Sequence, residues 1–135
     1  MTIERFLEGP GVRRPNFGGR DVYSHAVASR RPKMIFIAGQ LAGDKDGNVV
    51  GKGDMRAQMR QVGENIKAAL ALAGATLDDI VQTSTFVTDW DKFRECLDVR
   101  YEYIGKVLPT STTVQVSGLA HPDYMIEISV IAMVD

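Results

Sequence analysis

Glu127 is a carboxylate in an otherwise apolar segment near the end of the chain. Strand periodicity gives residues 124–134 one fully apolar face and a second face that holds Glu127 among methionine and isoleucine side chains. A carboxylate that loses its water costs several kcal/mol unless it is paired or protonated. Burial raises the pKa of such a group toward the range useful for acid–base chemistry. Two interpretations stay open: Glu127 belongs to a site, or it lies at a wet rim and solubilises the strand.

Few other residues have types and spacings that could do chemistry. Residues 110–113 follow Pro109 and offer hydroxyls that can hydrogen-bond a polar ligand, or that simply favour a strand and its preceding turn. No base with an orienting partner accompanies them, so a serine nucleophile is not supported. His25, His121 and the single cysteine, Cys96, lack the spacing of metal ligands. We expect neither a metal nor a cofactor.

Periodicity predicts the elements that position these residues. A helix of residues 54–73 has Asp54 as its N-cap and an apolar residue at every third or fourth position. Gly63 inside it costs about 1 kcal/mol relative to alanine, which indicates close approach of this helix to the sheet. A second helix begins near Asp89, ends at Gly105 and has one apolar stripe, formed by Phe93, Leu97, Tyr101 and Ile104. We expect strands at residues 23–28, 34–38, 80–87, 112–117 and 124–134, with a possible extra strand at 3–6.

The order of these elements, β-β-α-β-α-β-β, favours an α+β fold. Both helices are amphipathic, so they should pack on one face of a mixed sheet. The opposite face, with Met125, Ile131 and Met133, would then be uncovered. Exposed apolar surface of this kind indicates that copies of the chain associate.

Composition narrows the class of protein. A chain of 135 residues has the size of one domain, 1–135, and 44% hydrophobic with 24% charged residues is ordinary for a globular protein. The net charge is −1, and the sequence lacks the basic stripe that is typical of a nucleic-acid-binding protein. One cysteine fits a reducing compartment. Since no signal peptide or apolar run of about 20 residues is visible, we expect a cytoplasmic protein with no membrane contact.

Several segments, in order and at matching spacing, resemble the Rid family, also called YjgF or L-PSP proteins. They are Tyr23-Ser24-His25-Ala26-Val27, Ile37-Ala38-Gly39-Gln40, Glu64-Asn65-Ile66 in the first helix, Thr85-Phe86-Val87-Thr88-Asp89, Pro109-Thr110-Ser111-Thr112, and Ile126-Glu127-Ile128 with Ile131-Ala132. Each segment alone is a weak signal, whereas the ordered set covers nearly the whole chain. The resemblance implies a chorismate-mutase-like fold and a homotrimer with clefts between subunits.

The best-known members of this family hydrolyse reactive enamines and imines to keto acids and ammonia. The resemblance implies a small-molecule substrate, with Glu127 positioning the attacking water and Tyr23 shaping the cleft; these two are the expected catalytic residues. The expected substrate-binding residues around them are Ala38, Gly39, His25, Ser111, Thr112 and Thr113.

One family feature is missing from this chain. Ser111 stands where the family has an arginine that grips the substrate carboxylate, and a serine cannot make that bidentate, charge-assisted contact. The segment 93–101 is also one residue longer than in the arginine-bearing members. The chain thus resembles an arginine-lacking branch: either its substrate lacks the carboxylate, or another cation replaces the grip. The candidate cations, which the sequence does not rank, are Arg20, Arg30, Arg31 and Arg100.

Three functions stay open. The first is hydrolysis of a small enamine, imine or related C–N substrate, and the second is non-catalytic binding of a small metabolite in the same cleft. The third is ribonuclease activity, which only old family labels suggest. The near-neutral charge and the absence of paired catalytic histidines argue against it.

Overall fold

A four-stranded mixed sheet forms the centre of the protein. The computed structural model describes residues 2–135. The strand order is β5-β8-β6-β7, with β8 antiparallel to both of its neighbours and β6 parallel to β7. This confirms the predicted α+β class. The strands are β5 (Lys33–Gln40), β6 (Ile80–Val87), β7 (Thr110–Gln115) and β8 (Ile126–Val134).

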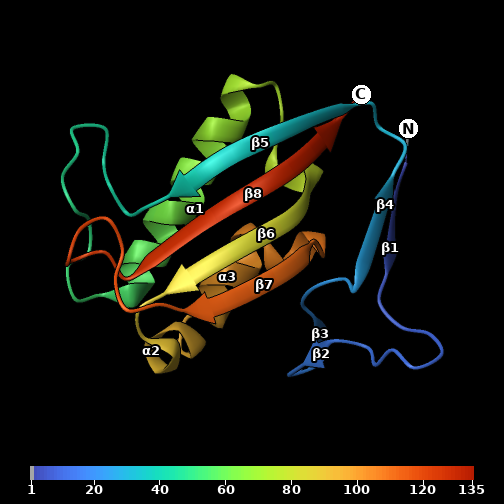
Figure 1. The fold of residues 1–135 in the computed structure, drawn as a ribbon, viewed down its shortest axis with the longest axis horizontal. Coiled ribbons are helices and arrows are strands. Elements are labelled where there is room, and N and C mark those ends of the chain that lie inside the picture. Colours follow the sequence, from blue (N-terminus) through green and yellow to red (C-terminus); the bar gives the residue numbers. More distant parts are fainter. Residues whose placement is uncertain (1) are drawn as a thin grey trace.

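The helices of the described residues lie on one side of this sheet, as predicted for the two expected helices. Figure 1 shows α1 (Met55–Leu72) and α3 (Leu97–Tyr103) behind the strands, with α2 (Trp90–Arg94) beside the β7 edge and the front face uncovered. The core lies between the layers and includes Ile126 and Ile128 of β8 and Ile66 of α1, all fully buried. Short 3₁₀ turns at Leu77–Asp79 and Gly105–Val107 precede β6 and β7.

The N-terminal strands form ladders of their own. β1 (Ile3–Phe6) pairs antiparallel with β4 (Ala26–Ser29), and β2 (Asn16–Phe17) pairs with β3 (Arg20–Asp21). Neither pair is hydrogen-bonded into the four-stranded sheet. The strand predicted to begin at residue 23 is β4, which begins three residues later.

The second predicted helix is wrong in its continuity. Its first segment, α2, ends at Arg94, and Cys96 leaves the helical region with φ −115° and ψ 15° before α3 begins. This turn changes which side chains face the sheet. Leu97, expected inside, is 45% exposed, whereas Val99 and Arg100 are buried.

The first predicted helix is confirmed, but Gly63 within it lies against a helix and not against the sheet. The Asp54 carboxylate accepts a hydrogen bond from the backbone N–H of Ala57 and caps α1. A Cβ at Gly63 would lie 2.5 Å from Cγ of Tyr103. The close approach is thus between α1 and α3, not between helix and sheet.

Gly63→Val is expected to lower the free energy of unfolding by about 1–3 kcal/mol, because the added carbons overpack against the Tyr103 ring. Urea unfolding followed by circular dichroism measures this change. Ala68→Val places the same side chain on an exposed site of α1 and should have a much smaller effect. Equal effects of the two substitutions would contradict the packing explanation.

Candidate functional site

Glu127 lies on the uncovered face of the sheet, half-buried, and pairs with Phe86 of β6. Gly39 of β5 lies directly against it: a Cβ at Gly39 would be 2.7 Å from Oε2 of Glu127. Within residues 2–135 no hydrogen bond or ion pair engages this carboxylate. Glu127 can therefore accept a hydrogen bond from a water molecule or a ligand.

A β-bulge shapes the backbone beside this glutamate. Ile37 pairs with Val130 and Gln40 pairs with Ile128, so that two residues of β5, Ala38 and Gly39, oppose one residue of β8. The side-chain amide of Gln40 donates a hydrogen bond of 3.0 Å to the carbonyl of Ala38. Bulges of this kind re-aim groups next to active sites. The expected backbone contacts at Ala38 and Gly39 are thus adjacent to Glu127.

A second group of predicted residues lines a cavity of about 360 Å³ between the edge strand β7 and helices α2 and α3. Tyr23, Ser111 and Thr113 are in its wall. His25 and Thr112 are not: the His25 ring hydrogen-bonds to the carbonyl of Arg13, and Thr112 is exposed. The other residues of the wall are Phe17, Val22, Trp90, Phe93, Leu97, Arg100 and Tyr101.

Ser24 brings Tyr23 and Ser111 together although they are far apart in sequence. It is 2% exposed. Its backbone N–H donates to the carbonyl of Pro109, and its hydroxyl donates to the carbonyl of Leu108. The segment before β4 is thereby attached to the start of β7, which holds both residues at one cavity.

Arg100 is the cation that faces Ser111. Its guanidinium donates a hydrogen bond of 2.8 Å to the Ser111 hydroxyl. Only 7% of the residue is exposed, and no acidic side chain among residues 2–135 pairs with it. Desolvation lowers the pKa of Arg100 to about 10, so the group stays charged at neutral pH. Among residues 2–135, Arg100 is thus the candidate cation that hydrogen-bonds to Ser111.

The other three candidate arginines have different surroundings. Arg20 stacks over the ring of Tyr101, with its Cζ 4.6 Å from the ring centroid. Arg31 pairs with Asp79 at 2.7 Å. Arg30 is exposed, in the turn after β4.

The two groups of residues lie on opposite faces of the sheet. Ladder partners point to the same face. Glu127 pairs with Phe86, which pairs with the exposed Val114. Ser111 pairs instead with Thr83, which is fully buried on the helix side. One copy of the chain therefore does not place Glu127 and Arg100 in the same cavity.

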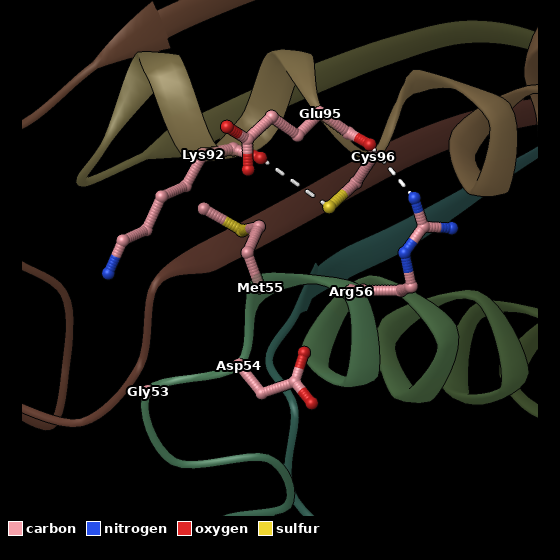
Figure 2. A pocket seen from close by; sticks show the side chains of 7 residues that line it. All are labelled: Gly53, Asp54, Met55, Arg56, Lys92, Glu95 and Cys96. Atoms are coloured by element: carbon pink, nitrogen blue, oxygen red, sulfur yellow. Dashed lines mark hydrogen bonds between the residues drawn. The ribbon is translucent and has the colours of Figure 1, made fainter.

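A larger cavity, about 480 Å³, lies where α1 begins, next to the turn between α2 and α3. Figure 2 shows that the Cys96 thiol in its wall hydrogen-bonds to the carbonyl of Lys92, and that the Arg56 guanidinium reaches the backbone carbonyl of Glu95. Burial raises the pKa of Cys96, so its thiol is a poor nucleophile at neutral pH. These polar groups hold helices together and do not converge on a ligand.

The described residues contain no cluster of three or more His, Cys, Asp or Glu side chains placed to hold a metal ion. Within the same residues, no helix is long and apolar enough to cross a membrane.

Comparisons with known proteins agree with this fold. The family described as Endoribonuclease L-PSP matches residues 16–134. A RutC family protein of Pyrococcus horikoshii is 41% identical, with 82% of this chain and 85% of that protein aligned. The Rid family protein YyfB of Yersinia pestis has a similar structure, with a TM-score of 0.75, 34% identity and coverage of 83% of this chain and 86% of that one. The structure of TdcF of E. coli with bound serine is also similar, with a TM-score of 0.68 and 29% identity. The alignment covers 84% of this chain and 88% of that one. The chain therefore belongs to the YjgF/L-PSP family, also called the Rid family.

Proposed function

We propose that this protein hydrolyses a small imine, or an enamine through its imine tautomer, with Glu127 positioning the attacking water. The observation that carries the proposal is the unpartnered Glu127 carboxylate beside the bulge at Ala38 and Gly39. Membership of the Rid family supports it, and the serine bound to TdcF supports an amino-acid-like ligand.

The reaction needs one group that can accept and return protons. As water adds to the imine carbon, Glu127 takes a proton from the water and passes it to the imine nitrogen. In the tetrahedral intermediate, a second proton moves from the new hydroxyl to nitrogen through the same carboxylate. The C–N bond then breaks, ammonia leaves and a carbonyl group remains.

A homotrimer would complete the site. The uncovered face exposes Met34, Phe36 and Val114 by 51%, 69% and 41%, which favours burial against other copies. Because Glu127 and Arg100 lie on opposite faces of the sheet, a shared cleft needs Glu127 from one copy and the Arg100 cavity from the next. A ring of three copies repeats the same contact at each interface.

The experiment is an assay with 2-imino acids that an L-amino-acid oxidase generates in situ. Release of ammonia is followed with and without the protein. The proposal predicts that wild-type protein speeds this release over buffer and that Glu127→Gln does not. A ligand bound by wild-type protein and recovered unaltered after long incubation would instead support a non-catalytic metabolite-binding protein.

A further inference from the structure

Arg100 is a buried cation that has no acidic partner among residues 2–135. Desolvation is the one cause that shifts its pKa, and no acidic neighbour offsets it. A buried charge without a partner destabilises a protein. Such groups persist where a ligand supplies the partner, which makes Arg100 a candidate for binding rather than for stability.

The guanidinium also has donors to spare. Arginine carries five N–H donors in a planar fork, and Arg100 gives one side-chain hydrogen bond, to Ser111. The complement to this fork is a planar oxyanion such as a carboxylate, which it can hold by two parallel hydrogen bonds.

Contacts with α1 fix the position of helix α3, which carries the Arg100 guanidinium. Arg56 of α1 forms a two-pronged ion pair with Asp98, at 2.9 and 3.1 Å. The ring of Tyr103, at the end of α3, packs over Gly63 of α1. Arg100 lies between these two attachments.

The wall around Arg100 is aromatic and aliphatic. Phe93 is buried at its base, and Phe17, Trp90 and Leu97 are 62%, 40% and 45% exposed around it. A volume of about 360 Å³ is in the usual range for small-molecule sites. A two- or three-carbon acid would leave most of this apolar wall uncovered, whereas a phenyl-sized substituent would bury it.

We propose that Arg100 anchors the carboxylate of a ligand whose bulky apolar side chain occupies this cavity. If the function proposed above holds, the substrate is a 2-imino acid with an aromatic or large aliphatic side chain. The proposal thus deepens that function by naming the substrate class, but the cavity can be tested by binding alone.

The test uses Trp90, which is the single tryptophan of the chain and lines the cavity. Its fluorescence is titrated with 3-phenylpropanoate, with the neutral 3-phenylpropanamide and with propanoate. We expect 3-phenylpropanoate to bind about 10- to 100-fold more tightly than the amide. It should also bind at least about 10-fold more tightly than propanoate. Equal affinity for acid and amide in wild-type protein would overturn the proposal, whatever any variant does.

Arg100→Met should remove the preference for the acid over the amide. Because it deletes an unpaired buried charge, it should also leave the melting temperature unchanged or raise it. Arg94→Met, at an exposed arginine one helix earlier, is the matched control and should bind as wild type. A structural role for Arg100 predicts the reverse, a lower melting temperature with the preference for the acid retained, and that result would overturn the proposal.

The binding titration separates this proposal from the hydrolase. Selective binding without turnover of any imine would defeat the hydrolase and leave the cavity assignment intact. Turnover of small imines without selectivity for the bulky acid would defeat the cavity assignment alone.

Discussion

Glu127→Gln is expected to lower kcat/KM for imine hydrolysis by about 10²- to 10⁴-fold, the usual contribution of general acid–base catalysis. Glutamine has the same shape as glutamate but cannot accept a proton. Since no side chain among residues 2–135 pairs with Glu127, the melting temperature should stay within a degree or two of wild type, about the scatter of neutral surface changes. Initial rates of ammonia release and a thermal melt measure the two quantities.

The control for this substitution is Glu4→Gln, which makes the same change on an exposed strand of the N-terminal ladder. It should keep wild-type kinetics. If Glu127→Gln also kept wild-type kcat/KM on every imine that the protein accelerates, the role given to Glu127 would be wrong.

Gln58→Met is expected to lower the free energy of unfolding by about 2–4 kcal/mol. Gln58 is fully buried in α1. Its amide group donates to the carbonyls of Gly51 and Asp123, and its carbonyl oxygen accepts from the N–H of Met125, at 3.1, 2.8 and 2.8 Å. Methionine fills the same volume but leaves buried backbone groups without partners.

Gln61→Met is the matched control, because Gln61 lies on the same helix and bonds only to the Asn65 side chain. We expect Gln61→Met to lower the free energy of unfolding, measured with urea, much less than Gln58→Met does. Gln58 also fixes the entry into β8 two residues before Glu127. Gln58→Met should therefore reduce turnover even at low temperature, beyond the reduction that its loss of stability explains. A Gln58→Met protein as stable as Gln61→Met would refute the assignment.

The regular elements were the part of the fold that sequence could predict. Ile80–Val87 has the predicted bounds, because its β-branched residues lie between clear turns. α1 agrees within one residue at each end, since Asp54 caps it. Along β8, alternation correctly separated the buried Ile126 and Ile128 from the half-buried Glu127.

The burial of Arg100 could not be predicted in the same way. The sequence favoured a stripe with Leu97 and Tyr101 inside, whereas the chain makes a turn at Cys96 and buries Arg100. That turn has no proline or glycine to signal it. The spacing of Phe93, Cys96, Arg100 and Ile104, at three, four and four residues, was the available signal. Periodicity rules assign an arginine to solvent, so the presence of Arg100 in this stripe argued against its burial.

The separation of the two halves of the site also required the structure. Sequence placed Glu127 and Ser111 on neighbouring segments of one sheet, but pairing decides which face each side chain occupies. The ladder from β7 through β6 to β8 puts them on opposite faces. Under the proposed function, a single copy therefore carries two incomplete half-sites.

Subunit mixing tests that claim most directly. Glu127→Gln and Arg100→Met proteins are unfolded together, refolded at equal concentrations and assayed with an aromatic 2-imino acid, on which each alone is expected to be impaired. If each site takes Glu127 from one copy and Arg100 from its neighbour, random mixing rebuilds about a quarter of the sites with both residues intact. The account predicts recovery of about that share of wild-type activity. Mixed oligomers without any recovery would contradict it.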